Sequence, residues 1–124
     1  MVPGKKCILV VDDDFRVLRF SRLILQQAGY DVLTSTSGEE ALKLVKSEPP
    51  AVVILDPLMQ GTGGFETLRK LCELAETPVI AFSTDDSAES EIMRLGAADF
   101  VSKPFSPDDL LSKVAAIAGT PSKE

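Results

Sequence analysis

The sequence of 124 residues contains no histidine and only two cysteines, Cys7 and Cys72. Zinc sites are built mainly from these two residue types, so a zinc site is excluded. The same absence excludes the Ser–His and Cys–His nucleophile pairs of many hydrolases. Both cysteines lie within apolar patterns, which is typical of buried structural thiols.

Long apolar runs and basic clusters are also missing. The longest apolar runs have the length of a strand, far below the ~20 residues of a membrane span, and residues 1–6 are too short and polar for a signal peptide. With 13 basic and 19 acidic residues, the formal net charge is −6, which disfavours direct binding to nucleic acid or to an anionic membrane. We therefore expect a reduced, cytoplasmic protein with no nucleic-acid or membrane partner.

Two hydrophobic patterns alternate along the chain. Short runs rich in β-branched residues predict strands at 7–11, 31–34, 51–55, 78–82 and 98–101. The segments between them have apolar residues at helical spacing. The residues predicted to face the core are Val17, Phe20, Ile24 and Ala28 in the first helix, Ala41, Leu44 and Val45 in the second, Phe65, Leu68, Leu71, Cys72 and Ala75 in the third, Ala88, Ile92 and Leu95 in the fourth, and Leu111, Val114, Ala115 and Ala118 in the last.

This alternation predicts an α/β fold, with a five-stranded parallel sheet covered by helices on both faces. The runs CILVV and AVVIL are almost wholly apolar, as central strands are, whereas DVLT has the character of an edge strand. The pattern favours the doubly wound, flavodoxin-like order 2-1-3-4-5. We expect one domain over residues 1–124, with a core from about 5 to 119 and a frayed tail at 120–124.

Start and stop signals agree with these helices. Ser37 is predicted to cap the second helix in a capping box, with Glu40 reaching back to the Ser37 amide. Ser106 is predicted to cap the last helix, where it is followed by Pro and two Asp residues. Gly29 and Gly96 follow helices and can adopt the left-handed closing conformation.

Polar side chains follow four of the five predicted strands. Because parallel strands end at one edge of the sheet, where doubly wound folds bind ligands, we expect these side chains to meet in one crevice. Each also has a structural alternative, since Asp14 could cap the first helix and Ser83 the fourth. The segments are Asp12-Asp13-Asp14, Asp56, Ser83-Thr84 and Ser102-Lys103-Pro104.

These residue types suit phosphoryl transfer. Carboxylate oxygens are ligands that Mg²⁺ prefers, and Asp56 can act as a nucleophile toward phosphorus. Mg²⁺ and Lys103 would neutralise charge on the transferring oxygens, and Ser83 would donate a hydrogen bond to one of them.

Four motifs in register resemble the signature of bacterial response-regulator receiver domains of the chemotaxis-regulator type, and the resemblance covers nearly the whole chain. It implies that Asp56 is the phosphoacceptor and that Lys103 and Ser83 hold phosphoryl oxygens. It further implies Mg²⁺ ligands at Asp13, at Asp56, at Asp12 through water, and at the backbone carbonyl of Leu58. The motifs are Val10-Val11-Asp12-Asp13, the lone Asp56, Ser83 after PVIAF, and Lys103-Pro104-Phe105.

The resemblance also implies a role in signalling. Members of this family take a phosphoryl group from a sensor histidine kinase or a phosphotransfer protein. They catalyse their own phosphorylation and dephosphorylation, but they act as switches rather than as metabolic enzymes. They signal to a downstream protein through the face formed by the fourth helix, fifth strand and fifth helix. Phe100 falls where the family has a Tyr or Phe that swings inward, and it is equally well interpreted as a core aromatic.

Departures from the family pattern leave an alternative open. Pro57 follows the acceptor directly, and the usual MPxMDG turn reads MQGTGG at 59–64. The glycines of Gly61–Gly64 increase chain entropy there, so the activation route and the loop geometry are in question. A degenerate receiver that only binds proteins, without phosphorylation, is the second hypothesis.

Two other classes on the same sheet fit poorly. Aspartyl phosphatases have an Asp-x-Asp-x-Thr motif and cap insertions, whereas this chain has DDDFR at 12–16 and no length for a cap. A flavin carrier needs a phosphate-cradling loop after the first strand, where three aspartates would repel the phosphate. The cognate kinase, the oligomeric state and whether the chain is a stand-alone regulator stay open.

Overall fold

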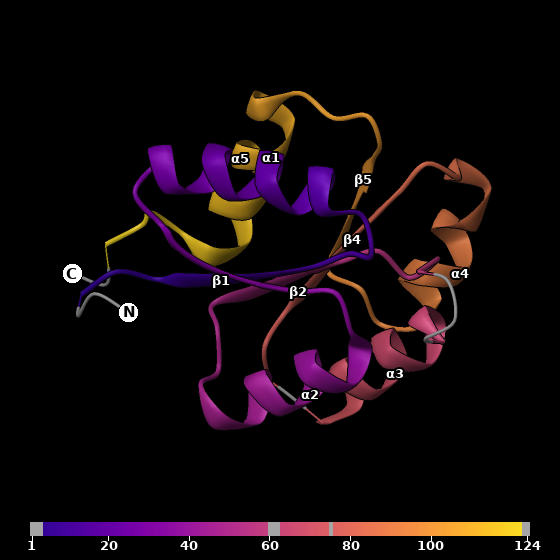
Figure 1. Ribbon diagram of the computed structural model, residues 1–124. Helices are drawn as coiled ribbons and strands as arrows, with labels where there is room; N and C mark the ends of the chain where they lie inside the picture. Colours follow the sequence, from indigo (N-terminus) through magenta and orange to yellow (C-terminus); the bar gives the residue numbers. More distant parts are fainter. Residues whose placement is uncertain (1–3, 60–62, 75, 123–124) are drawn as a thin grey trace.

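A five-stranded parallel sheet forms the centre of the molecule (Figure 1). The computed structural model describes residues 4–59, 63–74 and 76–122. The strands are β1 (Cys7–Val11), β2 (Asp31–Ser35), β3 (Val52–Leu55), β4 (Val79–Ser83) and β5 (Asp99–Ser102). The helices are α1 (Phe15–Gln27), α2 (Gly38–Ser47), α3 (Gly64–Leu74), α4 (Glu89–Arg94), preceded by the 3-10 turn η1 (Asp86–Ala88), and α5 (Pro107–Ala118). The strand order β2-β1-β3-β4-β5 confirms the predicted doubly wound fold.

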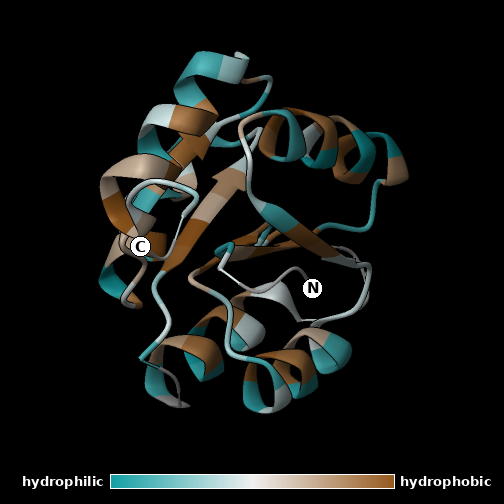
Figure 2. Ribbon diagram, turned by 90° about the vertical axis from the view of Figure 1, so that its left-hand side faces the viewer, coloured by the Kyte–Doolittle hydropathy of each residue, from teal (hydrophilic) through white to brown (hydrophobic). Residues whose placement is uncertain are grey.

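Two apolar layers cover the sheet because side chains of a strand alternate between its faces. Leu9 and Val11 of β1 pack with α2, α3 and α4, whereas Ile8 and Val10 pack with α1 and α5. Every residue of β1, β3 and β4 is buried, while β2 is only partly buried, as expected of an edge strand. In Figure 2 the central strands are largely brown, and the helices alternate between brown and teal.

The predicted helix faces were partly wrong. The buried side chains of α1 are Leu18, Ser21, Ile24 and Leu25, whereas Phe20 is 46% exposed and Ala28, at the end of the helix, is exposed. In α5 the buried residues are Leu110 and Val114, and Ala115 is exposed. Successive residues of a helix are about 100° apart around its axis. A predicted apolar stripe that is one residue out of register therefore includes positions that face solvent. Ala75 lies outside the described residues.

The predicted caps are confirmed with one correction. The Ser37 hydroxyl accepts a hydrogen bond from the Glu40 amide at 3.3 Å, but the Ser37 N–H donates to the Ser35 hydroxyl at 3.1 Å. Ser35 therefore occupies the donor that the capping box assigned to the Glu40 side chain. Ser106 caps α5 as predicted. Gly29 and Gly96 have φ values of 105° and 112°, so both helices close in the left-handed conformation.

The two chain ends meet at the edge of the sheet that is opposite the strand carboxyl ends. The Lys6 N–H donates to the Pro121 carbonyl at 2.8 Å, and the Tyr30 hydroxyl donates to the Gly119 carbonyl at 2.7 Å. Fraying of the tail stays a prediction, and 123–124 lie outside the described residues. Among the described helices, none has the length and apolar character of a membrane span.

Candidate functional site

The site begins where β1 and β3 end. Val11 and Leu55 are register partners in these adjacent parallel strands, so the next residues, Asp12 and Asp56, leave the sheet side by side. The Asp56 N–H donates to the Val11 carbonyl at 3.0 Å, and the Asp12 N–H donates to the Ser35 carbonyl at 3.1 Å. Backbone pairing alone therefore places two carboxylates at the switch point of the sheet.

Three of the predicted acids form one cluster. Carboxylate oxygens of Asp12, Asp13 and Asp56 all lie within 4.8 Å of one another. Asp12 is fully buried and Asp56 is 9% exposed, whereas Asp13 is exposed. Asp14 has the structural role considered for it, since its carboxylate accepts the Arg16 amide at 2.9 Å and caps α1.

Lys103 bridges the two buried carboxylates. Its ammonium donates to Asp12 Oδ2 at 2.6 Å and to Asp56 Oδ2 at 2.8 Å. The backbone amide of Lys103 donates to the Ser83 carbonyl at 2.8 Å, which fixes the end of β5 beside β4. The ammonium also lies 4.6 Å from the centre of the Phe82 ring, a cation–π contact that favours this position.

Burial and charge act on this cluster in opposite directions. Burial raises the pKa of Asp12 above its ordinary value, although the hydrogen bond from Lys103 lowers it. Burial also acts to lower the pKa of Lys103, but its hydrogen bonds with Asp12 and Asp56 outweigh this effect and raise the pKa. Lys103 is therefore an ammonium at neutral pH.

Ser83 lies beside Lys103 at the end of β4 and is 1% exposed. Its hydroxyl oxygen accepts the Asp85 N–H at 3.0 Å, and this leaves the hydroxyl proton available for donation. The alternative in which Ser83 caps the fourth helix is wrong, because Asp85 caps η1 by accepting the Ser87 N–H.

Leu58 and Phe100 take positions that leave their predicted roles untested. The Leu58 N–H donates to Asp56 Oδ1 at 2.8 Å, so Leu58 lies directly beside the carboxylate, and metal binding by its carbonyl stays a prediction. Phe100 is 6% exposed and packs with the α2, α3 and α4 side of the core. In this structure Phe100 is a core aromatic, and its movement stays a prediction.

The loop after Asp56 packs closely against α3. Pro57 is buried, and a Cβ on Gly64 would lie 2.2 Å from the Pro57 carbonyl oxygen. Gly64 is therefore required by close approach of two backbone segments. Gln60, Gly61 and Thr62 lie outside the described residues.

The acid cluster fits a divalent cation. When its three carboxylates are ionised, Lys103 balances one charge and two negative charges remain. Hard carboxylate oxygens grouped beside a crevice match the preference of Mg²⁺. Burial is the main cause of the raised pKa of Asp12, and the neighbouring Asp56 carboxylate also raises it.

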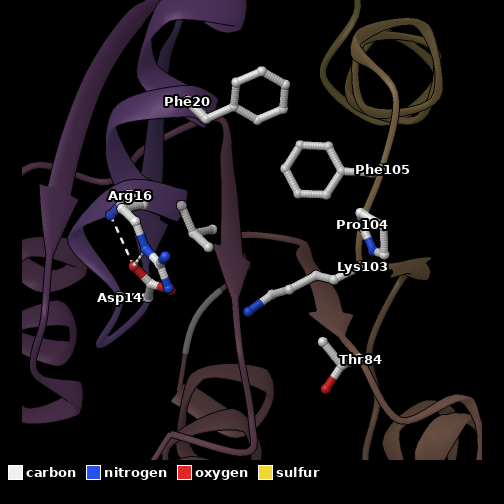
Figure 3. Close-up of a pocket in the computed structure, with 8 residues that line it drawn as sticks. Asp14, Arg16, Phe20, Thr84, Lys103, Pro104 and Phe105 are labelled. Atoms are coloured by element: carbon white, nitrogen blue, oxygen red, sulfur yellow. Dashed lines mark hydrogen bonds and ion pairs between the residues drawn. The ribbon is translucent and has the colours of Figure 1, made fainter.

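Sequence reasoning missed the aromatic surroundings of Lys103. Phe82 supports its ammonium, and Phe105 stacks on Phe82 with ring centres 5.9 Å apart. The ring centres of Phe20 and Phe105 are 5.7 Å apart, and both residues line the hollow beside Lys103 that Figure 3 shows. Helical periodicity assigned Phe20 to the core, and its spacing from Lys103 carries no signal in the sequence.

Comparison with known proteins identifies the family. The model of the response regulator receiver domain matches residues 8–115. The chain belongs to this family. The receiver domain of NtrX from Brucella abortus is 32% identical, with a TM-score of 0.83 over 90% of this chain and 97% of that one. A CheY-like receiver domain protein from Methanospirillum hungatei is 29% identical, with a TM-score of 0.86 over 93% and 94% of the two chains.

Curated relatives of this receiver domain are longer proteins. The alkaline phosphatase synthesis transcriptional regulatory protein PhoP of Bacillus subtilis is 35% identical over 115 residues, which are 90% of this chain and 48% of the relative. The chain spans about half the length of the curated relatives it matches. PhoP is named a transcriptional regulatory protein. The prediction that nucleic acid is not a partner therefore does not fit the full-length relatives, and it is restricted to the receiver domain.

Proposed function

We propose that this receiver domain is a phosphoacceptor switch of a two-component system. Asp56 takes a phosphoryl group from a sensor histidine kinase or a phosphotransfer protein, with Mg²⁺ as the cofactor. The observation that carries the proposal is the Lys103 ammonium, which lies 2.8 Å from Asp56 and 2.6 Å from Asp12. Such a bridge places a cation beside the nucleophile, where charge develops on the phosphoryl oxygens.

The chemistry uses few groups. An Asp56 carboxylate oxygen attacks phosphorus and forms the acyl phosphate bond, while the bond to the leaving group breaks and its electrons depart with that group. Lys103 and Ser83 hold phosphoryl oxygens. As an acyl phosphate, Asp56 no longer carries its carboxylate charge, so Lys103 turns from Asp56 toward the phosphoryl group. Burial of Asp56 restricts access of water to the new bond.

Mg²⁺ would be held by Asp13 and Asp56, by Asp12 through water, and by the Leu58 carbonyl. When bound, it would neutralise charge on the transferring oxygens. The two excess negative charges of the acid cluster support this assignment.

The output surface is proposed to be the face of α4, β5 and α5, read by a downstream protein. Only Ile92 of α4 is buried, and a helix with few buried contacts opens at low free energy. Asp86 of η1 accepts a hydrogen bond from the Ser102 hydroxyl at 2.5 Å, which couples the start of this region to the residue before Lys103. The cytoplasmic location remains a prediction.

Acetyl phosphate with Mg²⁺ tests the phosphoacceptor. We expect intact-mass measurement to show the addition of one phosphoryl group, and Asp56→Asn to abolish it. Asp14→Asn is a matched control, because Asn also caps helices and Asp14 lies outside the acid cluster. No mass gain by the unaltered chain at saturating donor and Mg²⁺ would reject the proposal.

A Mg²⁺ titration separates the switch from a degenerate receiver. Amide resonances of residues beside Asp56 should shift on addition of Mg²⁺, and Asp13→Asn should weaken the response. A receiver that has lost its metal site would show no such shifts while still binding its protein partner.

A further inference from the structure

The Lys103 ammonium has a third contact besides its two carboxylates, the face of the Phe82 ring. The distance from Lys103 Nζ to the ring centre is 4.6 Å, well inside the ~6 Å over which a ring attracts a cation. The Lys103 side chain is 11% exposed, and Phe82 is fully buried. Water therefore screens this attraction little, and the contact is stronger than one at the surface.

The fold fixes the Phe82 ring. Phe82 precedes Ser83 at the end of β4, and its register partner in β5 is Val101. Its side chain belongs to the apolar layer shared with α1 and α5, where Phe105 stacks on it at an interplanar angle of 26°. A fully buried ring with a stacked neighbour has little freedom to follow a moving ammonium.

Both carboxylate partners of Lys103 change during the proposed phosphoryl transfer. Asp56 loses its charge when its oxygen bonds to phosphorus, and Asp12 is proposed to bind Mg²⁺ through water. The Phe82 ring has no net charge, does not ionise and forms no bond in these steps. Its attraction for the ammonium is therefore constant throughout the transfer.

This difference decides at which step the ring matters. An interaction that is equally strong before and during a reaction leaves the rate unchanged. Before transfer, carboxylate oxygens at 2.6 and 2.8 Å hold the ammonium, so the ring adds little to its placement. During transfer the charge on Asp56 decreases, and the ammonium must stay beside the phosphoryl oxygens without being drawn away to Asp12. The ring restricts that movement.

We propose that Phe82 is a positioning residue for phosphoryl transfer, because the face of its ring keeps the Lys103 ammonium beside the phosphoryl group while Asp56 loses its charge. This inference rests on the proposed function. Phe82 acts only through Lys103. The electron density of the ring, and not its volume alone, therefore sets the rate of transfer.

Fluorinated phenylalanines at position 82 test this inference. Fluorine nearly preserves the shape of the ring and withdraws negative charge from its face. Rings with one, two and five fluorines are introduced, and initial rates of mass gain are measured with Mg²⁺. We expect the rate to fall with each step, by about threefold to tenfold for five fluorines. The loss should be equal with acetyl phosphate and phosphoramidate, because Lys103 binds the phosphoryl oxygens that both donors share.

A spectroscopic measurement reports the contact apart from the reaction. Protons over the face of an aromatic ring resonate upfield, so the ε-methylene protons of Lys103 should be shifted upfield in the unaltered chain without Mg²⁺. Phe82→Leu, if it retains a cooperative unfolding transition, should remove this shift and lower the transfer rate at least as far as five fluorines do. An unshifted Lys103 methylene in the unaltered chain would overturn the positioning role.

Phe65 provides the matched control, because it is a partly buried phenylalanine of the other apolar layer. The same analogues at position 65 should leave both rates unchanged. Equal losses at the two positions, a loss with one donor only, or no response to fluorine at position 82 would each overturn the positioning role. Failure of the unaltered chain to gain mass with either donor would instead overturn the proposed function, and the positioning role with it.

Discussion

Ser21 buries a hydroxyl group within α1. It is fully buried, and its Oγ has no hydrogen-bond partner among the described residues. A buried hydroxyl without a partner loses its hydration and gains nothing in exchange. Serine is also a weaker helix former than alanine.

We therefore predict that Ser21→Ala stabilises the chain. The free energy of unfolding should rise by about 1 kcal/mol, from the removed hydroxyl and the better helix propensity. Denaturation by urea measures this change. Ser112→Ala in α5 is the control, because Ser112 is exposed and its hydroxyl has a partner, the Asp109 carbonyl at 3.1 Å, so this serine has no buried unpaired hydroxyl. An equal rise in the free energy of unfolding at both positions would show that the buried hydroxyl of Ser21 does not destabilise the fold.

At the scale of secondary-structure elements, the contact between α2 and α3 depends on one glycine, Gly38. A Cβ on Gly38 would lie 2.2 Å from the Thr67 hydroxyl oxygen and 3.2 Å from the Thr67 Cβ. Thr67 is 5% exposed and β-branched, so it has little freedom to move aside. The first residue of α2 is thus restricted by the neighbouring helix.

Gly38→Ala is predicted to lower the free energy of unfolding by about 1–3 kcal/mol through this overpacking. In a Thr67→Ala background the same substitution should cost much less, since the hydroxyl at 2.2 Å is gone and only the Cβ contact at 3.2 Å remains. A double-mutant cycle by chemical denaturation measures the coupling. Equal effects of Gly38→Ala in the two backgrounds would contradict it.

On the scale of the whole molecule, Tyr30 and Lys6 hold the C-terminal segment against the sheet. Tyr30 is 4% exposed, and its hydroxyl donates to the Gly119 carbonyl at the end of α5. The Lys6 ammonium donates to the neighbouring Ala118 carbonyl. These bonds join the start of β2, the segment before β1 and the end of α5.

Burial raises the pKa of Tyr30 above its ordinary value. A pKa raised in the folded state contributes stability that is fully present below the unfolded-state pKa, about 10, and is lost as the pH rises through the folded-state pKa. Tyr30→Phe should lower the free energy of unfolding at neutral pH by about 1 kcal/mol and make its alkaline decline shallower. Tyr30 is the single tyrosine and the chain has no tryptophan, so phenolate absorbance follows the titration directly. A midpoint at or below the ordinary value would contradict the prediction.

The sequence by itself determined the fold and located each strand end to within one residue. The runs CILVV and VVIL are almost wholly apolar, as strands in the middle of a parallel sheet are, because both of their faces are buried. Their pattern therefore favoured the observed strand order. Local capping was equally readable at Asp14 and Ser106, because a cap depends on residues within three positions. The acidic residues that follow β1 and β3 lie close together because neighbouring parallel strands end at the same edge of the sheet.

Only the tertiary structure decided which atoms meet across the crevice. The bridge from Lys103 to Asp12 and Asp56 depends on how the end of β5 packs beside β4, and no local spacing encodes that geometry. Phe20 shows the same limit, since helical periodicity assigned it to the core and packing against Phe105 left it in an open cavity. Local interactions set the elements, whereas contacts between distant residues depend on the packing of all of them at once.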